Sequence, residues 1–508
     1  MLITDRRQLR EYYSDKRVWQ GIPGIECTAK GILYATFYSG NVREGLGNYC
    51  ALLRSTDGGS SWSEPVAVRG GETVYRYYDP CLWLDPLGRL WWFCGKGPDQ
   101  GVWACVCDDP EQQELHWGEE RFIAHEVMMN KPTVLENGDW LLPIAVWDNQ
   151  LGTALPHDML KGAEKTGAYV WRSSDNGKTF TRLGAAVAPL RCFDEHAVVE
   201  LRSGVLYMII RNYPGLCKSY SYDKGLTWSL PQGFELPNPC TRPLLRRLRS
   251  GRLLLVNNTS EWGKRTNLTA YLSEDDGATW PWQLLLDDRM DISYPDLAEA
   301  ADGTLYIIYD RERGGYQPDI AHAQQCAREI LMAQIREQDI LDGKLTQPGS
   351  RLAVIVSKLG DYTGDTEIFR PVNVYEKEEM LDFLRESGDT EELLRRLFVW
   401  YAPNWERLPP EDAVHADTLL DRFLSDGKDG ALAELIDLLH AVPDETYSTQ
   451  SEIPHWVTEL FRQDGGADLR SAALQKGISY YWAKTSFRLL TGVSAETCRN
   501  ALFGSKEG

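Results

Sequence analysis

The chain has 508 residues, 43% of them hydrophobic, with 54 Lys and Arg against 74 Asp and Glu, which gives a formal net charge of −20. This acidic balance lacks the basic surface that nucleic acid or an anionic membrane requires, so we expect neither as a partner. No run of eighteen apolar residues occurs, and the first residues lack the apolar segment of a signal peptide, so we expect a cytoplasmic protein without a membrane span.

A short pattern, G-x-L (once G-D-W-L) followed by apolar residues, recurs along the chain and predicts a turn that leads into a strand. Its six copies begin at Gly31, Gly88, Gly138, Gly204, Gly251 and Gly303. The steps between them, 47 to 66 residues, fit four-stranded propeller blades. The sequence therefore predicts a mainly β fold, with a six-bladed β-propeller over residues 1–360.

A second motif, S-x-D-x-G-x-x-W, closes the turn after the third strand in four of these repeats. It begins at Ser55, Ser173, Ser221 and Ser273, with Phe in place of Trp in the second copy. Asp can accept hydrogen bonds from backbone N–H groups, Gly permits a positive φ, and Trp can bury a large apolar face. We expect these aspartates to form turns and not to bind metal. The eight His show no paired ligand spacing, so we expect neither a metal site nor a cofactor.

The chain after the propeller has a different pattern. Residues 376–508 hold 25 acidic and 14 basic residues, which is −11 of the net −20, and their apolar residues have helical spacing. The sequence predicts a small C-terminal α-helical domain over residues 376–508. The simplest interpretation is an appendage for stability or for contacts between copies of the chain, because acidic helix faces are usually only solvated.

Polar residues recur where the first strand of each blade begins. A proline stands eight residues before the glycine in four blades, and the residues at or beside this position are Asp79, Lys131, Glu195, His196, Arg242 and Tyr294. The second strand returns to the same end, which adds Arg211 and Asp310, each seven residues after its glycine. Because the first strands line the propeller axis, we expect these eight side chains to converge on one binding pocket.

These residues and the four S-x-D-x-G-x-x-W motifs resemble the sialidase (neuraminidase) superfamily with its Asp-box, or BNR, repeats, over roughly residues 18–345. The resemblance implies an active site made of Glu195, Arg211, Arg265 and Tyr294. In the first blade, where sialidases have an arginine in an R-I-P motif, this chain has Gly21-Ile22-Pro23.

The resemblance implies an exo-acting glycoside hydrolase that removes a terminal acidic sugar, sialic acid or a related one, from a small glycan. Tyr294 would be the nucleophile and Glu195 would take its proton, since a free phenol is a poor nucleophile. Arg211, Arg265 and Arg242 would bind the substrate, together with Lys131, Asp310 and Glu44.

Asp79 and Glu44 are the candidates for the acid that protonates the leaving oxygen, and His196 with Asp194 forms an alternative acid–base pair. Two other functions fit the same residues. One is a uronic-acid lyase, in which arginine neutralises the carboxylate and tyrosine or histidine moves the proton. The other is a propeller that binds glycans without catalysis.

Overall fold

The computed structural model describes two compact units, one within residues 1–369 and one near the C-terminus. The described residues are 1–40, 44, 47–71, 75–97, 101–124, 127–146, 167–188, 193–212, 215–261, 264–314, 324–363, 381, 384–385, 390, 393–394, 397, 401, 404–405, 407–427, 429–442, 453–491 and 494–503. The predicted boundary between 360 and 376 lies mostly outside these residues.

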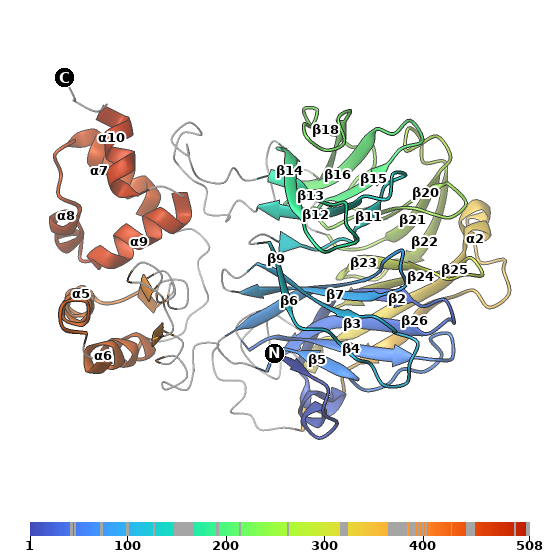
Figure 1. The fold of residues 1–508 in the computed structure, drawn as a ribbon, viewed down its shortest axis with the longest axis horizontal. Coiled ribbons are helices and arrows are strands. Elements are labelled where there is room, and N and C mark those ends of the chain that lie inside the picture. Colours follow the sequence, from blue (N-terminus) through green and yellow to red (C-terminus); the bar gives the residue numbers. More distant parts are fainter. Residues whose placement is uncertain are drawn as a thin grey trace. The chain divides into compact units, whose positions relative to one another are not determined.

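The first unit is a ring of six antiparallel sheets, so the predicted propeller is confirmed (Figure 1). In each blade the first strand is innermost. Blades one to three contain β2 (Trp19–Cys27), β3 (Leu33–Gly40), β4 (Tyr49–Ser55) and β5 (Ala67–Arg69); β6 (Arg76–Leu84), β7 (Leu90–Gly97), β8 (Val102–Cys107) and β9 (Arg121–Ala124); β10 (Val127–Met128), β11 (Thr133–Val134), β12 (Trp140–Val146), β13 (Gly167–Ser173) and β14 (Thr181–Ala186).

Blades four to six follow the same order. They contain β15 (Ala197–Glu200), β16 (Leu206–Asn212), β17 (Gly215–Ser221) and β18 (Gln232–Gly233); β19 (Leu244–Arg247), β20 (Leu253–Asn258), β21 (Leu268–Ser273) and β22 (Trp282–Asp287); β23 (Ile292–Glu299), β24 (Thr304–Arg311), β25 (Glu329–Arg336) and β26 (Arg351–Lys358). A short helix, α2 (Glu337–Asp342), joins β25 to β26.

Two blades depart from the expected four strands. Blade one has a fifth, outer strand, β1 (Leu2–Ile3), which pairs with β5 and is preceded by no repeat motif; two short 3-10 helices, Gln8–Tyr12 and Ser14–Lys16, follow it. In blade three the inner strand is broken, because β10 and β11 both pair with β12 and leave Met129–Pro132 between them unpaired.

The ring closes between blades one and six without a shared strand. The Gln20 backbone N–H donates to the Arg313 carbonyl at 3.0 Å, and its side-chain amide donates to the carbonyls of Arg328 and Ser357 at 2.7 and 3.1 Å. Both blades are continuous stretches of chain, so hydrogen bonds between them hold the seam together with an apolar core to which Ile25 and Ile308 belong.

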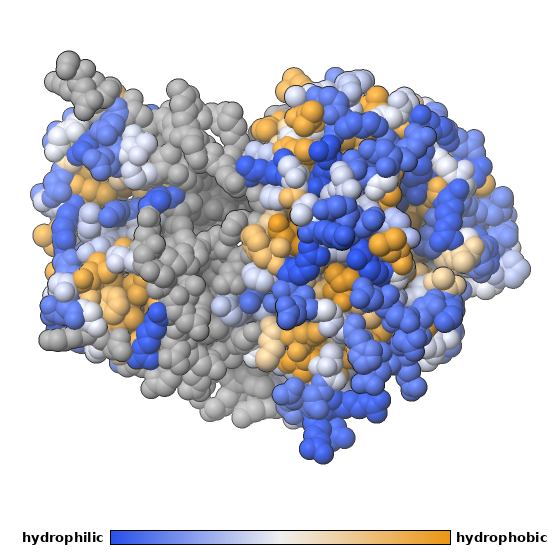
Figure 2. All heavy atoms as spheres, in the orientation of Figure 1, coloured by the Kyte–Doolittle hydropathy of each residue, from blue (hydrophilic) through white to orange (hydrophobic). Residues whose placement is uncertain are grey.

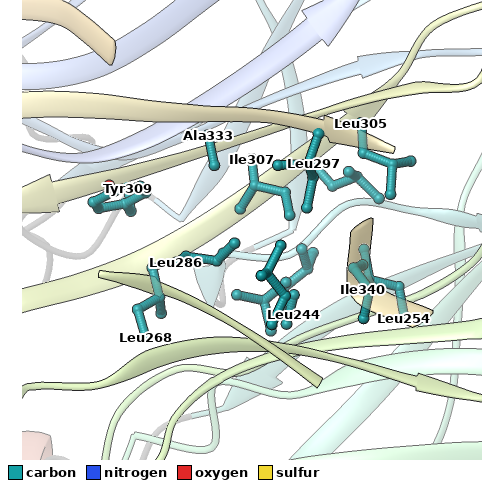
Figure 3. Close-up of a cluster of buried hydrophobic side chains, with 14 of the residues drawn as sticks. Leu244, Leu254, Leu268, Leu286, Leu297, Leu305, Ile307, Tyr309, Ala333 and Ile340 are labelled. Atoms are coloured by element: carbon teal, nitrogen blue, oxygen red, sulfur yellow. The ribbon is translucent and has the colours of Figure 1, made fainter. Parts of the chain in front are cut away.

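Apolar side chains fill the spaces between neighbouring blades. Figure 3 shows one such core, in which Leu244 and Leu268 of blade five lie opposite Leu297 and Ile307 of blade six, with Ile340 of α2 at one end. All five are at most 5% exposed. Burying one such side chain contributes about 1.5–3 kcal/mol. On the surface of the propeller shown in Figure 2, apolar residues are scattered among hydrophilic ones.

The four S-x-D-x-G-x-x-W motifs form the turns that their sequence predicts. In the first, the Asp57 carboxylate accepts hydrogen bonds from the Ser60 and Ser61 N–H groups at 3.0 Å and from the hydroxyls of Ser55 and Ser61 at 2.8 and 2.6 Å. The aromatic residue of each motif, Trp62 in this one, packs against the core shared with the preceding blade. Each motif therefore ties its own hairpin and fastens two blades.

These turns make the stability of the propeller depend on acid pH. Hydrogen bonds from Ser61 to Asp57 and from Thr179 to Asp175 lower the pKa of both carboxyls from 3.8 to about 2. A depressed folded-state pKa contributes stability that is complete above the unfolded value and is lost as pH falls towards the folded value. We expect the free energy of unfolding to fall between about pH 4 and pH 2. The Asp57→Asn/Asp175→Asn variant should lose less over that interval, as urea titrations would measure; equal slopes would contradict this.

The C-terminal unit is helical where the structure describes it. It contains α5 (Pro410–Asp426), α6 (Asp429–His440), α7 (Ile453–Gln463), α8 (Leu469–Lys476), α9 (Tyr480–Thr491) and α10 (Ala495–Phe503). Asp417 of α5 accepts the Tyr480 N–H at the start of α9 at 2.7 Å, and Asp421 accepts the Tyr481 hydroxyl at 2.7 Å. None of the helices in the described ranges is long and apolar enough to span a membrane.

Candidate functional site

Three inner strands contain a β-bulge at the same place. Ile22, Asp79 and Tyr294 each precede a proline, each has a positive φ (52°, 48° and 56°), and the pairing with the second strand shifts register at each. Such a conformation costs a non-glycine residue about 1–3 kcal/mol and is found mainly at functional sites. A bulge also re-aims the side chain it carries. Three of the residues that precede a proline at the start of an inner strand are therefore strained.

Tyr294 meets a carboxylate and a guanidinium from blade four. Its hydroxyl lies 3.4 Å from Glu195 Oε1, while Arg211 Nη1 donates to Glu195 Oε2 at 2.6 Å. All three side chains are buried. Burial, followed by the charge of Glu195, raises the pKa of Tyr294 to about 12, so the phenol is neutral and needs a base to take its proton. Glu195 is placed to be that base.

Three further guanidinium groups surround the Tyr294 ring. The Cζ atoms of Arg242, Arg265 and Arg313 lie 5.2, 5.4 and 5.1 Å from its centroid, within the range of cation–π attraction. Arg242 donates to the carbonyls of Met129 and Pro295 and is buried, whereas Arg265 is half-buried and donates to the Ser293 hydroxyl at 3.2 Å. Together with Glu195 and Arg211 they form what we call the Tyr294 cluster.

Asp310 fixes the start of blade one. Its carboxylate accepts the Ile22 backbone N–H at 2.8 Å and the Ser293 hydroxyl at 2.9 Å, and Arg313 Nε lies 3.7 Å away. The side chain is fully buried, and burial raises its pKa. Asp310 therefore lies beside the cluster, but its contacts are those of a residue that holds two blades together.

The two predicted acids, Asp79 and Glu44, differ in charge state. Burial, which outweighs the nearby Arg76, raises the pKa of Asp79 to about 7, and Glu44 and Glu195 contribute to the rise. For Glu44, burial favours the neutral form, but ion pairs with Arg76 at 2.7 Å and Arg313 at 2.9 Å prevail and lower its pKa. At neutral pH, Asp79 can carry a proton and Glu44 is ionised.

Lys131 does not join the cluster, which corrects the expected convergence. Its Nζ donates to the carbonyls of Ile25 and Leu82 at 2.5 and 2.6 Å, and to Glu26 at 2.9 Å, with Asp296 at 3.1 Å. These partners lie further along the inner strands. The reason is the break in the inner strand of blade three, which places Lys131 deeper on the axis than its counterparts in the other blades.

His196 and Asp194 also lie apart from the described contacts of Tyr294. The two ring nitrogens of His196 face the backbone carbonyls of Asp194 and Tyr169 at 2.8 and 2.6 Å. The ring is 2% exposed, and burial lowers its pKa, so the histidine is a neutral group between two backbone segments. Asp194 is buried with a φ of 42° and supplies the carbonyl that faces His196. An acid–base role for this pair has no support in these contacts.

Two residues of the site were missed by the sequence argument. Arg313 follows β24 and Arg76 begins β6, so neither stands at a position shared by all blades. Arg313 is ten residues after Gly303, whereas the argument counted seven. Pairing could have pointed to Arg76, because it pairs with Gly97 at the same end of the blade as Tyr78 with Gly95, whereas Arg313 lies beyond the last paired residue of β24 and has no such signal.

Two cavities lie in the described part of the propeller, away from the Tyr294 cluster. These cavities, of about 660 and 680 Å³, lie at the other ends of the inner strands, beside Arg246 and Arg247, and neither is lined by the Tyr294 cluster. Within the described ranges no group of three or more His, Cys, Asp and Glu side chains is arranged to hold a metal ion. The concentration of strained and charged residues therefore marks the Tyr294 cluster as the candidate active site.

Comparison with known proteins gives two curated relatives, both sialidases. Those of Bacteroides fragilis and Micromonospora viridifaciens are each 24% identical to this chain, over 336 and 330 residues. The matches cover 57% and 58% of this chain, and 59% and 50% of the relatives. The chain thus spans little more than half the length of these relatives.

Similar solved structures include two intramolecular trans-sialidases. The leech enzyme, complexed with 2,7-anhydro-Neu5Ac, has a TM-score of 0.48 and 14% identity, and the match covers 65% of this chain and 70% of that one. The Ruminococcus gnavus enzyme has a TM-score of 0.47 and 14% identity, with 66% and 98% covered. A family model, the BNR repeat-like domain, matches residues 31–307, which is more than half of the chain. The chain therefore belongs to the BNR repeat-like domain family, within the sialidase superfamily.

Proposed function

We propose that this protein is a retaining, exo-acting glycoside hydrolase that releases a terminal acidic sugar, sialic acid or a related one, from a glycan. The observation that carries the proposal is the Tyr294–Glu195 pair, with the phenol oxygen 3.4 Å from the carboxylate and three guanidinium groups within 5.4 Å of the centroid of the phenol ring. A phenol next to a base is a nucleophile, and guanidinium groups bind carboxylates.

The charges of the site favour an anionic substrate. Five arginines (Arg76, Arg211, Arg242, Arg265 and Arg313) lie with four carboxyl groups (Glu44, Asp79, Glu195 and Asp310), and burial raises the pKa of Asp79 and of Asp310. The site therefore carries an excess of positive charge in a chain whose net charge is −20. A substrate carboxylate would balance this excess.

The reaction would proceed in two steps. In the first, the Tyr294 oxygen bonds to the anomeric carbon while the bond to the leaving oxygen breaks; the phenol proton passes to Glu195, and Asp79 protonates the leaving oxygen. In the second, water attacks the anomeric carbon and gives a proton to Asp79, the tyrosyl bond breaks, and Glu195 returns the proton to the phenolate. Two displacements at one carbon retain its configuration.

Asp79 suits the role of acid better than Glu44. An acid must hold its proton at the working pH, and Asp79 has a pKa of about 7, whereas the two arginines beside Glu44 lower its pKa. Glu44 is instead placed to orient Arg76 and Arg313, since one carboxylate oxygen bonds each of them.

The test is turnover of 4-methylumbelliferyl glycosides of N-acetylneuraminic acid, glucuronic acid and galactose, with mass analysis of the released sugar. We expect release from an acidic glycoside only, and a product that has gained one water. Arg265→Ala should raise KM for it by about ten- to a hundred-fold, the loss of a hydrogen bond to a charged group. Arg265 is the cleanest of the arginines to remove, because its hydrogen-bond partner is the Ser293 hydroxyl and not a carboxylate.

The control is Arg289→Ala, which removes a surface arginine that pairs with Asp287 at 2.6 Å. It should leave KM unchanged. A product lighter by one water, with the absorbance of a conjugated double bond, would show that the reaction is that of a lyase and not hydrolysis. Preference for the galactoside would contradict the proposal that the substrate is acidic.

A further inference from the structure

Gly21 and Arg313 share one volume at the seam between blades one and six. A Cβ placed on Gly21 would lie 2.1 Å from Arg313 Cδ and 2.6 Å from its Cγ. The φ of Gly21 is outside the left-handed region, so the backbone does not require glycine there. The side chain of Arg313 requires it, because the aliphatic stem crosses the space in which any other residue at position 21 would place its Cβ.

The position of this stem determines where the guanidinium group of Arg313 lies. The Arg313 side chain is 10% exposed, its Cζ is 5.1 Å from the centroid of the Tyr294 ring, and Nη1 donates to Glu44 at 2.9 Å. Glu44 binds Arg76 with its other oxygen, and Asp310, 3.7 Å from Nε, is also held by a backbone N–H. Neither carboxylate is thus dedicated to Arg313, and together they orient its guanidinium towards the nucleophile.

We propose that Arg313 is a substrate-binding residue that contacts the carboxylate of the acidic sugar and gives specificity for acid over ester, and that glycine at position 21 leaves the space that the Arg313 stem occupies. The inference rests on the proposed acidic substrate and adds a residue from the end of β24 to the arginines of the Tyr294 cluster. A fixed guanidinium loses little freedom when it forms hydrogen bonds to a carboxylate.

Binding is measured in the Tyr294→Phe background, which keeps the aromatic ring and stops turnover. The ligands are the methyl glycosides of N-acetylneuraminic acid and of glucuronic acid, each as the free acid and as its methyl ester, titrated by calorimetry. The readout is the ratio of the Kd of the ester to that of the acid. We expect Arg313→Ala to lower this ratio by about ten- to a hundred-fold, with the Kd of the ester nearly unchanged.

The matched control is Arg311→Ala. Arg311 lies two residues earlier and pairs with Glu329 at 3.0 Å and Glu312 at 3.1 Å, away from the cluster. It should leave the ratio as it is. Arg313→Lys keeps an aliphatic stem and the positive charge but loses the planar guanidinium that can bind a carboxylate with two hydrogen bonds. It should fold normally and lower the ratio less than Arg313→Ala does.

A second variant tests the shared volume. Gly21→Ala must displace Arg313, so alone it should lower the ratio about as much as Arg313→Ala does. Added to Arg313→Ala it should cost little more, because the two Arg313 atoms that it overlaps are gone and the remaining neighbour, Asp310 Oδ2, is 3.2 Å away. Additive losses would show that the glycine matters for another reason and would overturn this part of the proposal.

The outcomes separate this inference from the proposed function. Equal weakening of acid and ester in Arg313→Ala, or no change in either, overturns the role of Arg313 while the reaction stands. A lowered ratio together with no turnover by the wild-type chain supports Arg313 and removes the hydrolase. If the wild-type site binds neither acid more tightly than its ester, both proposals are wrong.

Discussion

Replacing Tyr294 by Phe, or Glu195 by Gln, is expected to lower kcat on an acidic glycoside by about 10²–10⁴-fold in each single variant, the range for a positioned general base. The double variant should lose little more than either, because a nucleophile and its base act as one unit. The structural reason is the position of the Glu195 carboxylate: its Oε1 lies 3.4 Å from the Tyr294 hydroxyl, and its Oε2 accepts a hydrogen bond from Arg211 at 2.6 Å. Steady-state kinetics of the four proteins give the test.

Blade six supplies a matched control for this experiment. The Tyr309 hydroxyl donates to Asp287 at 3.0 Å, a second buried pair of phenol and carboxylate outside the site. Tyr309→Phe should lower the melting temperature and leave kcat unchanged. Tyr294→Phe should lower kcat and leave the melting temperature unchanged. Losses that multiply in the double variant, or a Tyr294→Phe enzyme with near-normal kcat, would exclude the phenol as nucleophile.

Asp79→Asn should show a loss that depends on the leaving group. An alkyl glycoside needs its oxygen protonated, so kcat/KM should fall by about 10²–10⁴-fold, while a nitrophenyl glycoside, with a good leaving group, should lose much less. Because the acid works in its protonated form, the wild-type rate on the alkyl glycoside should fall as pH rises through about 7, the pKa of Asp79. That alkaline limb should vanish in the variant.

Glu44→Gln is the control for the identity of the acid. Arg76 and Arg313 lower the pKa of Glu44, so its amide variant should keep the alkaline limb and the ordinary dependence on the leaving group. If instead Glu44→Gln loses the limb and Asp79→Asn keeps it, the two carboxyl groups exchange roles.

The repeats predicted most of the fold and the centre of the site. The fixed offset from each glycine placed Asp79, Glu195, Arg242 and Tyr294 at the start of inner strands, and antiparallel pairing brought Arg211 to the same end. Only the period of the blades was needed for this, because equivalent positions converge in a ring. The strained φ of Tyr294 and of Asp79 was not predictable, since a proline after a residue does not specify a bulge.

The misses occur where one blade departs from the others. Lys131 is displaced because the inner strand of blade three is broken, and β1 adds a strand without any repeat motif. Arg313 pairs with Glu44 across the seam, so its position depends on a contact between residues 269 apart in sequence. The charge states of Asp79 and Glu44 could not be predicted from the sequence either. They depend on burial and on neighbouring arginines, which follow from the packing of the folded chain.

The seam between blades one and six has a mechanical consequence. No strand crosses it, and the hydrogen bonds of Gln20 with Arg313, Arg328 and Ser357 span it together with that of Ile22 with Asp310. Tyr294 and Arg313 belong to blade six, whereas Gly21 and Glu44 belong to blade one. If the ring opens at this seam, Tyr294 and Arg313 on blade six separate from Gly21 and Glu44 on blade one. Closure of the propeller ring and assembly of the candidate active site therefore occur together.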